Sequence, residues 1–167
     1  FLQISMTNLA LRRFGMDAEG LLDCDIDELA WAEGQSVYQR AGQSAVGVVR
    51  MRGRWIEAAR APDMEARHHA FRHRLANFRH RLSPPKWVLD PRRDWVKPLS
   101  VHPYLHRIHG APITARHLDD TAMFFHFKGI NTNWKEERTD IKGIDIETLV
   151  EDEELQIARQ TLSVARA

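Results

Sequence analysis

Strand-like apolar stretches alternate along this chain with segments of helical periodicity, and no other feature of the sequence constrains the fold as much. We expect strands at 21–26, 45–56, 86–89, 98–104 and 122–128, and helices at 2–14, 35–41, 63–82 and 151–166. Strands separated by helices indicate an α/β protein, a mixed sheet flanked by helices, because each helix must bury its apolar stripe. The 167 residues are enough for one core, so we expect a single domain over 1–167.

The clearest helical signal lies at 63–82, where apolar residues recur at steps of three, four and seven. Asp63 suits a helix N-cap, and the two prolines after Ser83 end the pattern. Arginines and histidines crowd the same segment, which predicts a basic helix at 67–81. Its basic face is either a solvated surface or a docking site for an anionic partner. The segment 151–166 is expected to form a C-terminal amphipathic helix, with acids in its first turn as the helix dipole favours.

The charge balance excludes a strongly basic nucleic-acid binder, because 24 Lys and Arg residues nearly offset 23 Asp and Glu residues, for a net charge of +1. We therefore expect no nucleic-acid partner. Cys24 is the single cysteine, so it forms no internal disulfide, which is typical of a reducing compartment. No apolar run approaches the roughly 18–20 residues that cross a bilayer. These features predict a cytoplasmic protein, with peripheral association at the inner face of the membrane as a further expectation.

The acidic segment 22–29 carries the strongest chemical signal. If it continues the preceding strand, the alternation of side chains places Asp23, Asp25 and Asp27 on one side. Three such carboxylates repel each other unless a cation or basic groups compensate them, and their oxygens suit Mg²⁺ or Mn²⁺. These ions also bridge phosphate oxygens, and ligands of α/β sheets bind at strand ends of this kind. A solvated acidic turn is the alternative.

Four blocks of the sequence together resemble one enzyme family. Segment 21–29 (Leu-Leu-Asp-Cys-Asp-Ile-Asp-Glu-Leu) resembles the Asp-x-Asp-Glu-Phe/Leu strand end of bacterial family 2-like glycosyltransferases, which are related to the family 92 enzymes. Segment 125–135 (Phe-His-Phe-Lys-Gly-Ile-Asn-Thr-Asn-Trp-Lys) resembles their His-Phe-Lys strand and the following loop. Segments 85–89 (Pro-Lys-Trp-Val-Leu) and 100–103 (Ser-Val-His-Pro) are similar to two intermediate blocks, and the order of all four agrees.

The resemblance implies a GT-A type fold and inverting transfer of a sugar from a nucleotide-sugar donor to a glycan or lipid-linked acceptor, in polysaccharide biosynthesis. It implies that Asp25 and Asp27 hold the cation, Mn²⁺ or Mg²⁺, and the diphosphate. Glu28 would orient that loop or touch the donor sugar, His126 would return to the metal or the diphosphate, and Lys128 would offset phosphate charge. A nucleotide-binding portion of about a hundred residues normally precedes these blocks. The resemblance therefore implies a partial GT-A fold, the acceptor-side, C-terminal portion of such an enzyme.

Inverting transfer needs a base that takes the proton of the acceptor hydroxyl. Asp119 and Asp120 are candidates because they precede the His126 strand, and Glu57 is a weaker one. Glu28 is a further candidate catalytic residue by its place in the acidic motif.

His102 and Lys86 lie in the two intermediate blocks, so the resemblance implies that they bind substrate. His69 and His73 would share a face of the expected helix, which allows a zinc site or, alternatively, an ordinary polar face. Four tryptophans are candidates for stacking on sugars or for core packing, namely Trp55, Trp87, Trp95 and Trp134.

Two other functions remain as alternatives at this stage. The first is a non-catalytic module that binds an anionic partner through the basic helix 67–81. The second is a metal-dependent phosphohydrolase that uses the same aspartates.

Overall fold

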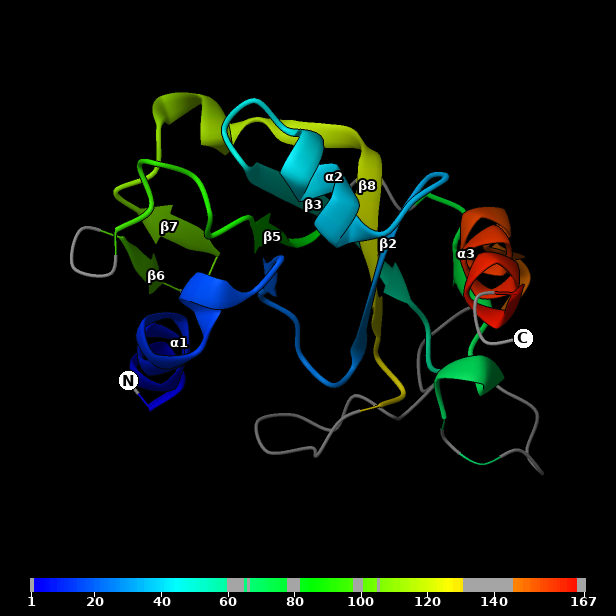
Figure 1. Ribbon diagram of the computed structural model, residues 1–167. Helices are drawn as coiled ribbons and strands as arrows, with labels where there is room; N and C mark the ends of the chain where they lie inside the picture. The colour runs from blue at the N-terminus through cyan, green and yellow to red at the C-terminus, as the bar shows by residue number, and fades with distance from the viewer. Residues whose placement is uncertain are drawn as a thin grey trace. The chain divides into compact units, whose positions relative to one another are not determined.

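The structure is a computed structural model that describes residues 2–59, 65, 67–77, 82–97, 101–104, 106–130 and 146–164. The described residues form three α-helices and nine strands (Figure 1). Their bounds are α1 Leu2–Arg13, β1 Leu21–Leu22, β2 Glu28–Ala32, α2 Val37–Gln43, β3 Val48–Ile56, β4 His73–Leu75, β5 Leu82–Leu89, β6 His102–Tyr104, β7 Arg107–His109, β8 Leu118–Phe127, β9 Leu149–Glu151 and α3 Glu153–Val164. Helices combined with a mixed sheet confirm the predicted α/β class.

Five strands are ordered β1-β5-β3-β8-β2 in the mixed sheet, and two further pairs are β4-β9 and β6-β7. The chain divides into two compact units. The first unit comprises Phe1–Cys24, Ala30–Arg52 and Pro84–Met123, and the second comprises Asp25–Leu29, Gly53–Ser83 and Phe124–Ala167. Each unit therefore gathers segments that are far apart in the sequence.

The first unit has a core of aliphatic and aromatic side chains that includes Leu11, Trp87, Leu89 and Val101. β1 pairs antiparallel with β5, and Leu21 lies opposite Leu89. α2 begins where the side chains of Ser36 and Gln39 form a reciprocal capping box, which satisfies two amides at the helix start. β6 and β7 form an antiparallel hairpin at the end of this unit.

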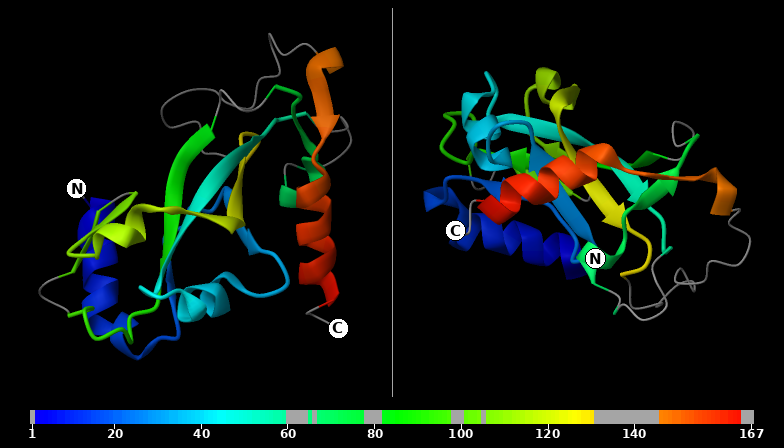
Figure 2. Two further views of the ribbon diagram at one scale, coloured as in Figure 1. Left: turned by 90° about the horizontal axis from the view of Figure 1, so that it is seen from above. Right: turned by 90° about the vertical axis from the view of Figure 1, so that its right-hand side faces the viewer.

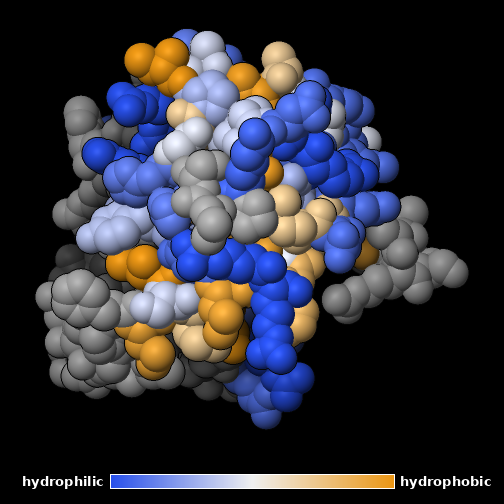
Figure 3. Space-filling view, turned by 60° about the vertical axis from the view of Figure 1, so that its left-hand side comes forward, coloured by the Kyte–Doolittle hydropathy of each residue, from blue (hydrophilic) through white to orange (hydrophobic). Residues whose placement is uncertain are grey.

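α1 packs against the rest of the first unit with one face, and its other face is exposed. The side-chain amide of Asn8 donates to the carbonyl of Pro103 at 2.8 Å, while Leu2, Met6 and Leu9 are exposed. On the face of the molecule in Figure 3, hydrophobic residues lie in separate patches among hydrophilic ones. In the described part of the chain, no helix combines the length and the apolar character that membrane crossing requires.

The second unit buries four phenylalanine side chains, those of Phe71, Phe124, Phe125 and Phe127. β4 pairs antiparallel with β9, and β9 leads directly into α3 (Figure 2). The junction is held by one carboxylate, because the fully buried side chain of Asp152 accepts from the amide of Leu155 and pairs with arginine side chains. α3 is thereby capped and charge-compensated at its first turn.

The predicted helix at 63–82, and with it the basic helix at 67–81, is wrong for residues 67–77. Residues His68–Ala70 form a short 3-10 turn, and β4 follows and pairs with β9. The carbonyl of His73 also accepts from the amide of Glu57 at 2.7 Å. Pairing with distant strands outweighs the local helical periodicity, since propensity is a weak preference beside tertiary contacts. Residues 60–64, 66 and 78–81 lie outside the described residues.

The acidic segment also differs from the expectation. Strand β1 ends at Leu22, 23–27 form a loop, and β2 begins at Glu28, so the three aspartates do not share one strand face. α2 ends at Gln43, two residues beyond the expected end at 41, and α3 begins at Glu153, two residues later than expected. Residues 131–135, in the loop that the resemblance places after the His-Phe-Lys strand, lie outside the described residues.

Candidate functional site

The acidic loop is closed by its own glutamate. Oε2 of Glu28 accepts from the amide of Asp25 at 2.9 Å, and the amide of Glu28 donates to the carbonyl of Asp25 at 3.1 Å. The side chain of Glu28 is 0% exposed. The carbonyl of Asp27 accepts from the amide of Phe127 at 2.8 Å, which fastens the loop to the end of β8. The loop is thus held at the same place as the His-Phe-Lys segment.

His126 lies at the centre of a polar cluster in the second unit. Its Nε2 atom is 3.1 Å from Oδ2 of Asp27, although the two residues are 99 positions apart. On the other side of the ring, Nδ1 is 3.1 Å from Oγ of Ser83 and 3.4 Å from Oε1 of Glu28. The ring of Trp55 stacks on the imidazole with centroids 4.0 Å apart. Four neighbours therefore fix the plane and both nitrogens of His126.

Lys128 and Glu57 form a second polar pair beside this cluster. Nζ of Lys128 donates to both carboxylate oxygens of Glu57, at 2.6 and 2.8 Å, and Glu57 is almost fully buried. The same ammonium lies 5.7 Å from the ring centre of Trp55. Glu57 already compensates the charge of Lys128. The ammonium group of this lysine is therefore less available to bind a phosphate group than the sequence suggests. Glu57 is likewise bound to Lys128 rather than placed as a base.

The Asp27 and His126 pair fits adjacent ligands of a divalent cation. Two neighbouring ligands of an octahedral ion, each about 2.1 Å from it, lie about 3 Å apart. Oδ2 of Asp27 and Nε2 of His126 are 3.1 Å apart, which suits either a hydrogen bond or a shared ion. Metal-binding histidines commonly direct their other nitrogen at a carboxylate, and Glu28 occupies that position here.

A cation at this place would need ligands from outside the protein. No group of three or more His, Cys, Asp or Glu side chains in the described ranges is arranged to hold a metal ion. Ions such as Mg²⁺ are, however, often held by one or two protein ligands together with substrate phosphates and water. Asp25 is exposed and reaches the cluster through its backbone amide.

The two aspartates expected as bases lie in the first unit. Asp119 pairs with Arg40 at 2.8 Å and accepts hydrogen bonds from Thr121. Partial burial by itself would raise the pKa of Asp119, but the hydrogen bonds from Arg40 and Thr121 outweigh it and lower that pKa below its ordinary value. An ionised, paired carboxylate of this kind is a weak base. Asp120 is exposed.

The two expected substrate-binding residues also lie in the first unit. His102 is exposed, and its Nδ1 is 3.2 Å from a guanidinium nitrogen of Arg12. Lys86 is buried in β5. His69 and His73 lie on a 3-10 turn and on β4, so they do not share a helix face.

Sequence reasoning missed Ser83 and underrated Trp55 and Glu57. Ser83 carried no signal, because it stood at the assumed end of a helix, where serine is common. Among the other tryptophans, Trp87 is core and the indole N–H of Trp95 donates to the carbonyl of Val46 at 2.9 Å, whereas Trp134 lies outside the described residues.

The structure brings Asp27, Glu28 and His126 together. No protein-family model matches this chain, and neither a curated protein nor a solved structure matches it. A functional inference therefore depends on the residues of the cluster and their geometry.

Proposed function

We propose that this chain is the acceptor-side part of an inverting, metal-dependent glycosyltransferase, similar to bacterial family 2-like enzymes. The donor is a nucleotide sugar and the acceptor a glycan or lipid-linked glycan. One observation supports this proposal above the others: the acidic loop and His126 meet at 3.1 Å across 99 positions of sequence. A solvated acidic turn has no reason to be held against a half-buried histidine.

Asp27 and His126 are the residues that would hold the cation, Mn²⁺ or Mg²⁺, through Oδ2 and Nε2. When bound, such an ion neutralises charge that develops on a diphosphate leaving group. Glu28 and Ser83 contact Nδ1 and set the orientation of the imidazole. We assign Glu28 this positioning role in place of a role as the base, because its carboxylate is fully buried and bound to the Asp25 amide.

Trp55 and Glu57 complete the arrangement around His126 and Lys128. Trp55 covers one face of His126 and so excludes water from that side of the ring. Glu57 holds Lys128 and keeps the positive charge of its ammonium beside, and not on, the cation site. The cluster therefore presents the carboxylate of Asp27 and one imidazole nitrogen, while Glu57 and Lys128 are paired with each other.

The test is Mn²⁺-dependent hydrolysis of, and transfer from, a panel of nucleotide sugars by the full-length protein that contains this chain. Asp27→Ala and His126→Ala should each lower kcat/KM on the order of 100-fold or more, since each removes a direct ligand. Glu28→Gln should raise the Mn²⁺ concentration needed for half-maximal activity by about 10- to 100-fold, with a smaller loss in kcat at saturating metal.

The matched control is Asp94→Ala, which removes an exposed carboxylate of the first unit and should leave turnover unchanged. Turnover that survives Asp27→Ala and His126→Ala at wild-type level in folded protein would refute the assignment. Release of phosphate from phosphomonoesters without any sugar donor would instead indicate a phosphohydrolase.

A further inference from the structure

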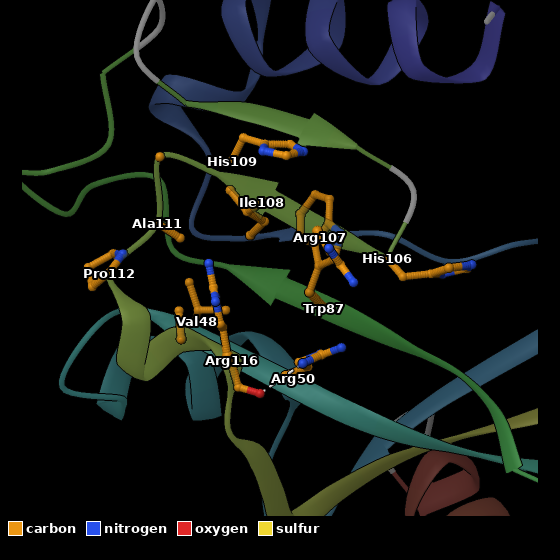
Figure 4. Close-up of a pocket in the computed structure, with 12 residues that line it drawn as sticks. Val48, Arg50, Trp87, His106, Arg107, Ile108, His109, Ala111, Pro112 and Arg116 are labelled. Atoms are coloured by element: carbon orange, nitrogen blue, oxygen red, sulfur yellow. Dashed lines mark hydrogen bonds between the residues drawn. The ribbon is translucent and has the colours of Figure 1, made fainter.

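A cavity of about 270 Å³ lies in the first unit, and none of the residues that line it belongs to the His126 cluster. Its walls come from β3, β5, the β6-β7 hairpin and the 3-10 turn Ile113–Arg116. Three arginines from three different elements line it, namely Arg50, Arg107 and Arg116 (Figure 4). His106 and His109 line the same cavity.

The charged side chains that line this cavity are all basic. Its lining contains no Asp or Glu, and within the described ranges none of the three guanidinium groups forms an ion pair with a carboxylate. Like charges that share a small space repel each other unless an anion joins them. The arrangement is therefore costly when empty and suited to a ligand with more than one negative charge.

Arg50 is held in place for such a ligand. One of its terminal nitrogens donates to the carbonyl of Arg116 at 2.8 Å, which fixes the side chain against the turn. Its Nε atom is buried and has no hydrogen-bond partner among the described residues. A buried donor without an acceptor is unfavourable, so a ligand oxygen that reaches it would gain a hydrogen bond that water does not supply. Arg107 and Arg116 are exposed enough to close over the ligand.

We propose that this cavity binds a small phosphate monoester, such as a sugar phosphate. A phosphate monoester carries between about −1.5 and −2 charges at neutral pH and three acceptor oxygens, which match three guanidiniums better than a carboxylate does. The planar forks of arginine pair with phosphate oxygens in a bidentate manner. The lining also includes the apolar side chains of Val48, Trp87 and Ile108, which suit the C–H face of a sugar ring. This site does not depend on the proposed glycosyl transfer.

The experiment is isothermal titration calorimetry of the purified protein with a hexose 6-phosphate, inorganic phosphate and a hexuronate, at fixed ionic strength. We expect the hexose phosphate to bind and the hexuronate to bind at least ten-fold more weakly. Arg50→Gln and Arg107→Gln should each weaken the hexose phosphate at least ten-fold, and higher salt should weaken it further. Arg52→Gln is the matched control, because Arg52 is exposed on the same strand as Arg50 and does not line the cavity.

Arg107 is exposed, so its substitution should leave the fold intact, as circular dichroism would verify. Equal affinities for inorganic phosphate and the hexose phosphate would assign the cavity to free phosphate and overturn the sugar-face part of the proposal. Absence of binding by both phosphates, or unchanged binding in folded Arg107→Gln protein, would overturn it altogether. Loss of glycosyl transfer in Asp27→Ala with phosphate binding retained would separate the two sites.

Discussion

At the scale of single residues, the behaviour of His126 depends on what its neighbours do to each nitrogen. Asp27 faces Nε2, while Ser83 and Glu28 face Nδ1. The sequence predicts the partnership with Asp27 through the acidic motif. It gives no indication of Ser83, because a serine before two prolines has many ordinary uses. A short polar side chain becomes part of a site only when another strand places a histidine beside it.

Gly53 is a residue at which the packing around this site can be tested. A Cβ added there would lie 2.6 Å from Cβ of Ser83 and closer still to the ring of Phe124. We expect Gly53→Ala to lower the free energy of unfolding by about 1–3 kcal/mol through overpacking. Gly42→Ala is the contrasting variant, because an added Cβ in α2 meets its nearest atom only at 3.8 Å. It should raise that free energy by about 0.5–1 kcal/mol, since alanine favours the helix.

Urea unfolding followed by circular dichroism measures both glycine variants. A Gly53→Ala protein as stable as the wild type would show that the strand, Ser83 and Phe124 do not approach as closely as described.

At the scale of elements, α3 is anchored by a carboxylate that the sequence misplaced. Asp152 was expected within the first turn of a helix, yet it precedes α3 as its cap. Its side chain is fully buried and pairs with Arg54 at 3.1 Å and Arg74 at 3.2 Å. Arg54 also contacts Glu154. One residue thus joins β3, β4 and the helix start within the second unit.

We expect Asp152→Ala to lower the free energy of unfolding by about 3 kcal/mol. The change removes a helix cap and leaves partly buried guanidinium groups without their carboxylate, and breaking a buried pair from one side is strongly destabilising. Glu153→Ala changes an exposed neighbour and should shift stability by no more than about 0.5 kcal/mol. Chemical denaturation of the two variants side by side measures the difference, and equal stabilities would contradict the anchoring role of Asp152.

The segment 67–77 shows why element type was harder to predict than element position. Apolar residues at helical spacing also suit a 3-10 turn followed by a strand when one of them, Phe71, is buried against Gly129. β4 is three residues long and pairs with a strand far along the chain. The periodicity of a short sequence window gives no information about a strand that pairs with it from outside the window.

At the scale of the whole molecule, two carboxylates make the free energy of unfolding depend on pH in the acidic range. Burial alone would raise the pKa values of Asp90 and Asp119, but hydrogen bonds, chiefly from Arg92 and Arg40 respectively, lower both below the ordinary value of 3.8. A lowered folded-state pKa means that the ionised form stabilises the fold above pH 3.8. That contribution is lost as the pH falls from 3.8 through the folded-state pKa.

We therefore expect Asp119→Asn to lower the free energy of unfolding by about 1 kcal/mol near pH 7. The difference from wild type should shrink once the pH falls below 3.8, where the unfolded-state carboxyl is protonated. Asp120→Asn, at the exposed neighbour, should show no such trend. Urea unfolding at pH 7 and at pH 3 measures both, and a difference for Asp119→Asn that grows on acidification would have the wrong sign for this account.

The sequence by itself determined the α/β class and the approximate positions of α1, α2, β5 and β8, which follow from local periodicity and capping residues. It associated Asp27 with His126 only through the resemblance to a known family. Only the tertiary structure decided that the acidic segment is a loop and that 73–75 form a strand. It also decided that Ser83 and Trp55 contact His126 and that Arg50 donates to the carbonyl of Arg116. The physical reason is the same in each case, because strand pairing and side-chain burial depend on residues far away in the sequence, which no local pattern contains.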